Sequence, residues 1–552
     1  MRIVMRRDTL KKFYSVHSWV GVITGILLFI IAFSGAVSVF GSPDLKIWSN
    51  PSLHTEVTVD PVKLDKLAEE YAVDIPQEFL HEVVVLLPGA KAFGDLYLLF
   101  ETDHGPDERV IAYSFDPHTL ALKERKEGPP KEVFAEEQMT LESFITHFHA
   151  NLHLGRLGLI LTGLLGLTLM ASIVTGVIIH RKILKEMFSF RPLRSLRLML
   201  TDSHKVLSVW GLLFHGMIGF TGAFLGLATV ILLPAAAFVS FQGDQDKLLE
   251  TFQPERMPVL SGEPADMQID TVLLKSDQLG ETTRSIVIMG WGDKNALAFS
   301  NTYGGDEMAF QTHSFQLQDG KVLETTTSFE LVGGVSGPIL DLMFPLHFGS
   351  FGGLPVRIIW ALLGLSTALI AVTGMMIWVE RRAYGAEGDL KPESYMRLSK
   401  LTIGSCSGMV VALAAMFWGQ RLLPAYVPEL FFVVWLLCLV YAFSRSNNYQ
   451  SNRQLLGVAG LLLAAVPFVD VATLEHHLFN SMAGTHTHLA IIDVVLFLSG
   501  GILLYIAKRL PSERQEEQHR AHKTKQTALD EELEESGETL VDTSTSTQVT
   551  EA

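Results

Sequence analysis

Long stretches without a single charged side chain constrain this 552-residue chain more than any other feature. A helix needs roughly 20 mainly apolar residues to cross a hydrocarbon core of ~30 Å. With 48% hydrophobic and only 18% charged residues, the composition is typical of a membrane protein. We therefore predict a mainly α, polytopic membrane helix bundle of about eight spans. The uncharged stretches are Val16–Phe40, Leu157–Ile179, Val206–Gln242, Ile358–Val379, Leu401–Gln420, Leu430–Ser444, Gln454–Val469 and Val494–Ala507.

Basic residues gather beside alternate ends of these stretches, and this pattern predicts their orientation. Lys and Arg within about 15–20 residues of a span end are retained on the cytoplasmic side. Both termini are therefore expected in the cytoplasm. The first stretch lacks a small-residue cleavage site, so we expect it to be retained as a span. The basic flanks are Arg6, Arg7, Lys11 and Lys12, then Arg181, Lys182, Lys185, Arg191, Arg194 and Arg197, then Arg381 and Arg382, and finally Arg445, Arg453, Lys508 and Arg509.

An internal repeat organises the first 385 residues. His17 and His204 are each followed, 16 residues later, by the motif Phe-Ser/Thr-Gly-Ala. His149 and His347 are each followed, at equal spacings, by Gly-Leu and then by Val-Thr-Gly. Because the motifs agree in register, we interpret the region as two copies of span, external segment and span. The motifs occupy Phe33–Ala36 and Phe220–Ala223, Gly166-Leu167 and Gly364-Leu365, and Val174–Gly176 and Val372–Gly374.

Each external segment predicts a small α+β module. Asp60-Pro61 precedes a short helical stretch and three strand-like runs, the last of which closes on the turn Asp116-Pro117. Ile269-Asp270 begins a comparable order that ends at the turn Asp319-Gly320. The runs are Val83–Leu87, Leu96–Glu101 and Val110–Phe115 in the first segment, and Ser285–Met289, Ala296–Phe299 and His313–Leu317 in the second.

The chain after Ser512 is rich in Glu, Asp, Ser and Thr, cannot bury a core, and is expected to be disordered. The predicted division is span 1 (1–40), a first external module (41–148), span 2 (149–181), a cytoplasmic loop (182–203), span 3 (204–242), a second external module (243–340), span 4 (341–382), a C-terminal four-span region (399–510) and an acidic cytoplasmic tail (511–552).

Histidines in or beside the spans are the candidate functional residues, because a polar ring is costly to place in hydrocarbon. The repeat pairs His17 with His204 at the cytoplasmic end, and His149 with His347 at the external end. Two bis-histidine sites are therefore predicted, one in each leaflet. Neutral imidazole suits iron, copper and zinc, and a haem iron accepts one axial His from each of two facing helices. Zinc instead requires three or four protein ligands, which such pairs do not offer.

Three further histidines have no counterpart in the repeat. His153 corresponds to Phe351, His180 to Trp378 and His215 to Leu28. Each could replace or supplement one of the paired ligands, or be an interfacial His that hydrogen-bonds a neighbouring carbonyl. The loop histidines His476, His477, His486 and His488 could bind a metal or be solvated, whereas Cys406 and Cys438 lack the spacing of a metal or redox pair.

These residues resemble the PepSY-associated transmembrane proteins, which are also described as iron-regulated membrane proteins. The resemblance covers about residues 1–385. The motifs that carry it are His17-Ser-Trp-Val-Gly, His149-Ala-Asn-Leu, Thr175-Gly176-Val-Ile-Ile-His180-Arg, Asp202-Ser-His204-Lys-Val-Leu, His347-Phe-Gly-Ser-Phe-Gly-Gly, Thr373-Gly374 and Trp378-Val-Glu-Arg-Arg.

The resemblance implies a protein of the bacterial inner (plasma) membrane with two small PepSY-like periplasmic modules. In characterised relatives it implies a dihaem reductase of ferric siderophores. We therefore expect two haem b groups, with the haem irons held by His17 with His204 and by His149 with His347. The chain is expected to pass electrons from the cytoplasm to a ferric siderophore or other ferric chelate, as a transmembrane ferric reductase.

The sequence has no recognisable nucleotide-binding motif of its own, which limits the possible electron donors. No Gly-x-Gly-x-x-Gly follows a predicted strand, so the cytoplasmic electron donor is expected to be a protein, a reduced flavin or quinol. The other partners are the lipid bilayer and the ferric substrate, and no nucleic acid partner is expected. Two alternatives stay open: a permease for a siderophore, haem or metal, in which the histidines are transient ligands, and a haem-free membrane protein whose external modules bind a periplasmic partner.

Overall fold

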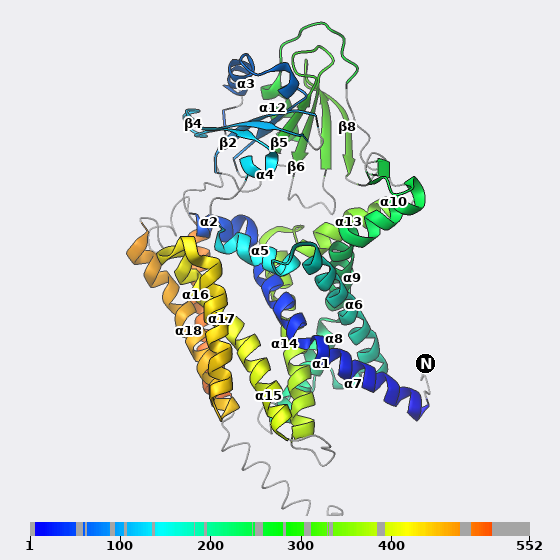
Figure 1. The fold of residues 1–552 in the computed structure, drawn as a ribbon, viewed down its shortest axis with the longest axis vertical. Coiled ribbons are helices and arrows are strands. Elements are labelled where there is room, and N and C mark those ends of the chain that lie inside the picture. Colours follow the sequence, from blue (N-terminus) through cyan, green and yellow to red (C-terminus); the bar gives the residue numbers. More distant parts are fainter. Residues whose placement is uncertain are drawn as a thin grey trace, which may run out of the picture.

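The computed structural model of the protein describes residues 6–510 except 51–58, 61–62, 89–93, 104–106, 135–138, 181–182, 192–195, 246, 249–257, 280–282, 303–310, 328, 330–334, 384–391 and 475–486. A helix bundle carries a single β-sheet domain at one end, which we call the sheet side (Figure 1). Helix α1 (Arg7–Ser38) begins at the opposite end, the N-terminal side. The predicted tail, 511–552, lies outside the described residues.

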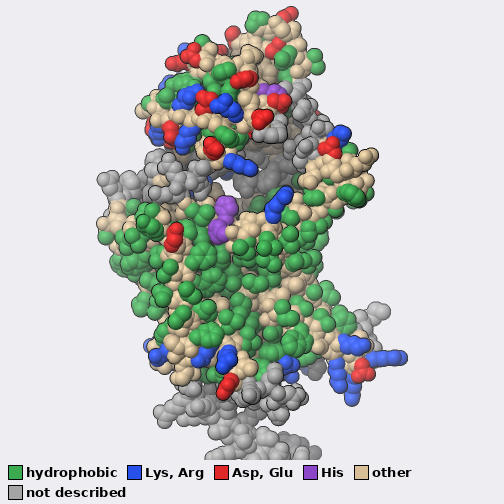
Figure 2. Space-filling view, viewed as in Figure 1, with side chains coloured by type: hydrophobic (Ala, Val, Ile, Leu, Met, Phe, Trp, Pro, Cys, Tyr) green, Lys and Arg blue, Asp and Glu red, His purple; other side chains and the backbone are tan. Residues whose placement is uncertain are grey.

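Eight described helices are long and apolar enough to cross a membrane, which confirms the predicted number of spans. Figure 2 shows their apolar side chains as a continuous belt, with charged side chains gathered on the sheet domain and at the opposite rim. Such a belt matches a hydrocarbon core bounded by water on both sides. The eight segments are Arg7–Ser38, Gly155–Ile179, Leu212–Phe241, Gly353–Arg382, Glu393–Leu422, Pro424–Ser444, Asn448–Thr473 and Leu489–Arg509.

The repeated helices form a closed group of four. Helix α1 packs against α6 (Gly155–Ile179) and α14 (Gly353–Ala383). The third stretch is divided at Gly211 into α8 (Leu196–Trp210), which packs on α14, and α9 (Leu212–Leu227), which packs on α6. Each contact in one copy therefore has an equivalent in the other copy. After α9 the chain continues through the π-helix η5 (Ala228–Leu232) into α10 (Leu233–Phe241).

Two short helices on the sheet side precede α6 and α14. They are α5 (Leu141–Asn151) and α13 (Ser336–Phe348). We expected His149 and His347 to lie within the second and fourth spans, but the structure places them near the ends of these separate helices. The chain reverses after each of them through residues with positive φ, namely Leu152 and Gly349. The resulting bends bring each histidine back over the bundle.

Repeated small residues let the helices approach closely. A Cβ atom at Gly166 of α6 would lie 2.7 Å from the backbone nitrogen of Ala223 in α9, so a larger residue does not fit there. The equivalent crossing of α14 and α1 joins Gly364 to Ala36, where the added Cβ would lie 3.2 Å from the alanine Cβ. The Gly-Leu motif and the final Ala of Phe-Ser/Thr-Gly-Ala therefore form the two helix crossings.

The C-terminal region adds a second group of helices beside α1 and α5. It comprises α15 (Pro392–Thr402), η6 (Ile403–Ser407), α16 (Gly408–Leu422), α17 (Val427–Ser444), α18 (Asn448–Thr473) and α20 (Thr487–Arg509). Its core includes Trp48 of α2 (Lys46–Ser49), a short helix that follows α1 and the π-helix η1 (Gly41–Leu45). Trp48 and Phe417 of α16 are both buried and their ring centroids lie 5.1 Å apart, so this group packs directly on the repeat.

The two external segments form one eight-stranded antiparallel sheet, which corrects the prediction of two separate modules (Figure 1). The strand order is β4-β3-β2-β1-β5-β6-β7-β8, so each segment supplies four consecutive strands. The halves join through β1 and β5, with Val84 opposite Val287. The strands are β1 (Glu82–Leu86), β2 (Leu96–Glu101), β3 (Val110–Phe115), β4 (Leu122–Gly128), β5 (Thr283–Met289), β6 (Leu297–Thr302), β7 (Gln311–Gln316) and β8 (Lys321–Thr327).

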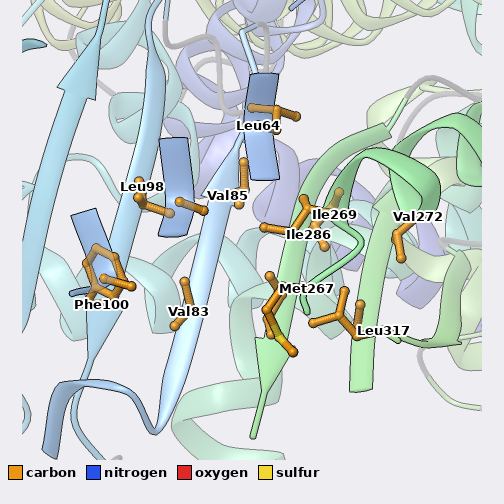
Figure 3. Close-up of a cluster of buried hydrophobic side chains, with 14 of the residues drawn as sticks. Leu64, Val83, Val85, Leu98, Phe100, Met267, Ile269, Val272, Ile286 and Leu317 are labelled. Atoms are coloured by element: carbon orange, nitrogen blue, oxygen red, sulfur yellow. The ribbon is translucent and has the colours of Figure 1, made fainter. Parts of the chain in front are cut away.

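One shared core explains why the two halves form a single domain. Side chains from both central strands, such as Val83, Val85 and Ile286, belong to one buried cluster (Figure 3). Helices α3 (Leu64–Ala72) and α12 (Ile269–Gln278) cover that face and contribute to the same cluster. Pairing β1 with β5 therefore buries one continuous apolar layer and satisfies the backbone groups of two strands that would otherwise be edges.

Candidate functional site

The four histidines paired by the repeat meet as two facing pairs. The ring centroids of His17 and His204 lie 6.2 Å apart, with 78° between the ring planes. The ring centroids of His149 and His347 lie 6.1 Å apart, with 25° between the planes. Helices α1 and α8 supply the first pair, and α5 and α13 supply the second. The bundle therefore contains two sites of the same composition, related by the repeat.

The pair on the N-terminal side is oriented by the Val-Thr-Gly motifs. Nδ1 of His17 lies 3.0 Å from the carbonyl oxygen of Ser172 and 3.1 Å from the hydroxyl of Thr175. Nδ1 of His204 lies 3.0 Å from the carbonyl oxygen of Ile370 and 3.4 Å from the hydroxyl of Thr373. A carbonyl oxygen accepts only, so each Nδ1 carries the proton and donates it. The Nε2 atom is therefore the nitrogen with a lone pair for a metal.

The pair on the sheet side is oriented by residues in, or just before, the Phe-Ser/Thr-Gly-Ala motifs. Nδ1 of His149 donates to the carbonyl oxygen of Ile31, at 2.9 Å. Nδ1 of His347 lies 2.9 Å from the hydroxyl of Thr221, which itself donates to the carbonyl of Met217. The hydroxyl must therefore accept from His347. All four rings use Nδ1 in the same way, and each is held by a helix other than its own.

A glycine lies beside Cε1 of each of these four rings, where a Cβ atom would come close to the ring. A Cβ atom added at Gly35 would lie 2.6 Å from Cε1 of His149, closer than real Cβ contacts come. The other three glycines would place a Cβ atom 3.0–3.3 Å from the ring of their histidine. The glycine after each Ser or Thr therefore lets the ring lie against the facing helix. These contacts pair Gly176 with His17, Gly374 with His204 and Gly222 with His347.

The ring separations fit two imidazoles on one metal ion. If the Nε2 atoms of two opposed imidazoles bind one ion at ~2.0–2.1 Å, the ring centroids lie roughly 6 Å apart. Both pairs have this separation within about 0.2 Å. Within the described ranges there is no group of three or more His, Cys, Asp or Glu side chains that could hold a metal. Two opposed imidazoles suit a haem, whose porphyrin supplies the other four ligands of the iron.

The two pairs lie at opposite ends of the repeated helices. His17 is on α1, and the carbonyl that orients His149 belongs to Ile31, 14 residues further along the same helix. At 1.5 Å per residue these positions are roughly 21 Å apart along the axis. That spacing is comparable with most of the thickness of a hydrocarbon core of ~30 Å.

Comparison with known proteins covers the region that contains the repeat. The family described as PepSY-associated TM region matches residues 14–381, more than half of the chain. The chain belongs to this family. An uncharacterized protein of Pseudomonas aeruginosa is 27% identical over 351 residues, which cover 59% of this chain and 86% of the relative. The PepSY-associated region contains both histidine pairs, and its match ends before α15.

A buried carboxylate ties α8 to the preceding connection, two residues before His204. Asp202 is fully buried, and both of its oxygens accept hydrogen bonds from the Arg191 side chain at 2.9 Å. Asp202 also accepts a bond from the backbone nitrogen of Arg191, at 3.0 Å. The guanidinium of Arg191 holds the pKa of Asp202 below its usual range, so the ion pair is kept at neutral pH.

The three unpaired histidines occupy different environments. His215 is buried and uses both ring nitrogens, with Nδ1 2.9 Å from the hydroxyl of Thr367 and Nε2 3.3 Å from the carbonyl of Leu207. Its surroundings favour a structural role. Nε2 of His153 lies 3.0 Å from the carbonyl of Phe144, and His180 caps the C-terminal end of α6. The loop residues His476, His477 and His486 lie outside the described part of the chain, as does the side chain of His488.

Sequence reasoning identified the motifs but not their function. We used Val-Thr-Gly and Phe-Ser/Thr-Gly-Ala as markers of the repeat, whereas in the structure they orient the rings. The equal spacing of a Thr-Gly or Ser-Gly pair in all four helices was the available signal. We also did not consider His147, whose ring centroid lies 6.2 Å from that of His153. Both free cysteines, Cys406 and Cys438, are buried.

Proposed function

We propose that this protein is a dihaem electron-transfer protein of the bacterial inner membrane, which passes electrons from the cytoplasm to a ferric siderophore or other ferric chelate in the periplasm. The observation that carries the proposal is the arrangement of four paired imidazoles. The Nδ1–H group of each ring donates a hydrogen bond to a facing helix, and the ring centroids of each pair lie ~6 Å apart. A haem b bound between each pair would supply a one-electron Fe3+/Fe2+ couple on each side of the membrane.

The residues around each pair would prepare it for such a ligand. Hydrogen bonds at Nδ1 fix the tautomer, hold the ring orientation and raise the basicity of Nε2. The glycines at Gly35, Gly176, Gly222 and Gly374 allow the rings to lie against the facing helices. Because the rings are anchored to helices other than their own, the closed packing of α1, α6, α8, α9 and α14 determines the ring separation.

Charge distribution supports the proposed orientation. Arg381 near the end of α14 bonds the hydroxyl of Tyr14 in α1, and Arg382 stacks on Trp378 with 4.3 Å to the ring centroid. These arginines mark the N-terminal side, which by the retention of basic flanks would be cytoplasmic. The sheet domain would then lie in the periplasm, above His149 and His347. An electron donor in the cytoplasm, whether a protein, reduced flavin or quinol, would act at the pair His17 and His204.

Reduction releases iron from hard chelating ligands for a chemical reason. Hard oxygen ligands such as those of many siderophores hold Fe3+ strongly, and the softer Fe2+ is held less strongly. The product is Fe2+ on the sheet side, available for uptake by another protein. The PepSY-associated family and the histidine geometry support this reaction class without identifying the chelate.

Oriented vesicles test the direction and the acceptor together. With a reductant on the N-terminal side only, the wild-type protein should reduce an impermeant ferric chelate on the sheet side. The His347→Ala protein should reduce it far more slowly, whereas His118→Ala, at an exposed turn of the sheet domain, should match the wild type. Equal rates for wild type and His347→Ala would contradict the proposal, and the permease or partner-binding alternatives would then lead.

A further inference from the structure

The C-terminal helices bury three ionisable side chains that the electron-transfer proposal does not use. The side chains of Arg421 in α16 and Asp470 in α18 are 4% and 1% exposed. The residue Asp493 in α20 is 1% exposed. All three lie within helices that can span a membrane. We had placed the ends of the uncharged stretches at these residues, but the helices continue past them. Ionisable groups in such positions are costly and are commonly functional.

Arg421 and Asp470 neutralise each other. Nε and Nη2 of Arg421 donate to the two carboxylate oxygens of Asp470, at 2.7 and 3.2 Å. The guanidinium also lies over the ring of Trp48, 3.7 Å from its centroid. A bidentate pair stacked on an aromatic ring is a stable arrangement for a buried arginine. The charge of Arg421 is therefore fully matched by one carboxylate.

Asp493 remains without a counter-charge. Its Oδ1 accepts a bond from Nε1 of Trp48 at 3.3 Å, and its Oδ2 is buried with no hydrogen-bond donor among the described residues. Its carboxyl group lies within interacting distance of Asp470, across the packed helices α18 and α20. An ionised, unpaired carboxylate beside another carboxylate in a dry interior is strongly unfavourable. A bound cation would remove this cost.

We propose that Asp493, with Asp470 and Arg421, forms a proton-binding site in the C-terminal helices. Binding converts the Asp493 carboxylate to a neutral acid, and its Oδ2 becomes a hydrogen-bond donor. The whole cluster then carries no net charge. A proton fits better than a metal ion because Asp470 is already occupied by Arg421 and too few oxygens remain to replace a hydration shell.

The position of the site indicates exchange with the sheet side. Arg421 is next to the last residue of α16, Asp470 is three residues before the end of α18, and Asp493 is near the start of α20. All three ends lie at the level of α2, on the sheet side of the bundle. The proposal does not depend on the histidine pairs, although the neighbouring Gln420 accepts a bond from Leu141 at the start of α5.

Among the described side chains, the other charges near α20 are already paired or distant. Asp44 of η1, which packs on α20, is paired with Arg357 of α14. Lys46 lies on α2, which also contacts α20, and is partly exposed. At the far end of α20, Arg453 donates to the carbonyl of Ala507 at 3.0 Å. Of the charged side chains that the structure describes, Asp470 and Arg421 are therefore the ones that act most strongly on Asp493.

Infrared spectroscopy of the full-length protein tests the proposal. At neutral pH the wild type should show a C=O band of a protonated carboxylic acid that appears in the difference spectrum between wild type and Asp493→Asn, and that cancels in the difference spectrum between wild type and the exposed control Asp8→Asn. It should also be lost in Asp470→Asn, because Asp493 then ionises as the partner of Arg421. A difference spectrum between wild type and Asp493→Asn that contains no such band would overturn the proposal.

Thermal unfolding of the same variants provides a test that does not depend on the band. Each single variant keeps one carboxylate for Arg421 and should unfold within a few degrees of the wild type. The double variant Asp470→Asn/Asp493→Asn leaves Arg421 unpaired. Its unfolding temperature should fall by much more than the sum of the decreases in the two single variants. Additive effects of the two substitutions would overturn the proton site. So would a sodium effect, in which NaCl raises the unfolding temperature of the wild type, but not of Asp493→Asn, relative to choline chloride at equal ionic strength.

Discussion

At the residue scale, each of the four paired histidines is fixed by the same local contacts. Nδ1 donates to an oxygen of a facing helix, a glycine lies against Cε1, and a second histidine lies ~6 Å away. The sequence predicted which four histidines are paired, because the repeat aligned them. It did not predict which helix holds which ring, because the Thr-Gly and Ser-Gly pairs contact histidines from other spans.

Gly35→Ala should displace the ring of His149. The added Cβ would lie 2.6 Å from Cε1 of that ring, so the ring must leave its present position beside His347. We expect about one of the two haems to be lost, as measured by haem content per chain. Gly21→Ala is the matched control on the same helix, because no atom lies within 4 Å of its added Cβ. Equal haem loss in both variants would show that the ring contact is not the cause.

Thr221→Val should weaken the same site without changing its shape. The hydroxyl that accepts from Nδ1 of His347 is removed, and loss of such an orienting contact typically lowers metal affinity 10–100-fold. Competition with a haem-binding scavenger should reveal faster loss from the variant. Thr168→Val, whose hydroxyl bonds only within α6, should behave like the wild type. Equal haem retention by Thr221→Val and the wild type would argue against the orienting role.

At the element scale, most helices and central strands were predictable, and the errors have a common physical origin. Strands β4 and β8 were missed because they are exposed edge strands, rich in charged or polar side chains, without an alternating apolar face. The predicted spans stop at Gln420 and Val469, or begin at Val494, because a charged residue is next in the sequence. In the structure these charged residues are buried, and the helices continue past them. In both cases the structure depends on contacts between residues far apart in the sequence, which local apolar patterns do not show.

The joint between the two halves of the sheet domain should depend on pH. Asp65 at the start of α3 accepts bonds from the backbone nitrogens of Ile269 and Asp270, at the start of α12. Burial, and then the carboxyl group of Asp270, raise the pKa of Asp65 to about 7, from ~3.9 in the unfolded chain. The protonated form is favoured by folding, so its contribution is complete below pH ~4 and is lost as pH rises through about 7.

Hydrogen exchange across β1 and β5, compared at pH 5 and pH 8, measures this effect after correction for intrinsic exchange rates. The wild type should lose protection at the higher pH, and Asp65→Asn should lose less, because the titrating group is gone. Asp74→Asn, on the exposed turn after α3, should follow the wild type. The same pH dependence in Asp65→Asn would assign it to another group.

At the scale of the whole molecule, two copies of one span pair are assembled so that each site is built from both copies. His17 and His149 come from the first copy, and their partners His204 and His347 come from the second. The sequence established this pairing through equal offsets. It did not show that the external segments share one sheet, because the register between β1 and β5 joins residues about 200 positions apart. The C-terminal helices, which lie beyond the family match, add the buried cluster around Asp493.

An optical spectrum with haem quantification, taken on the full-length protein purified from haem-replete cells, tests the two-site proposal most directly. Two bis-imidazole sites predict a low-spin b-type spectrum that is reducible by dithionite, with about two haems per chain. Replacement of His17 and His149 together should abolish both. A wild-type protein that is correctly folded yet carries no haem, or that retains two haems in the double variant, would contradict the assignment of these histidines as haem ligands.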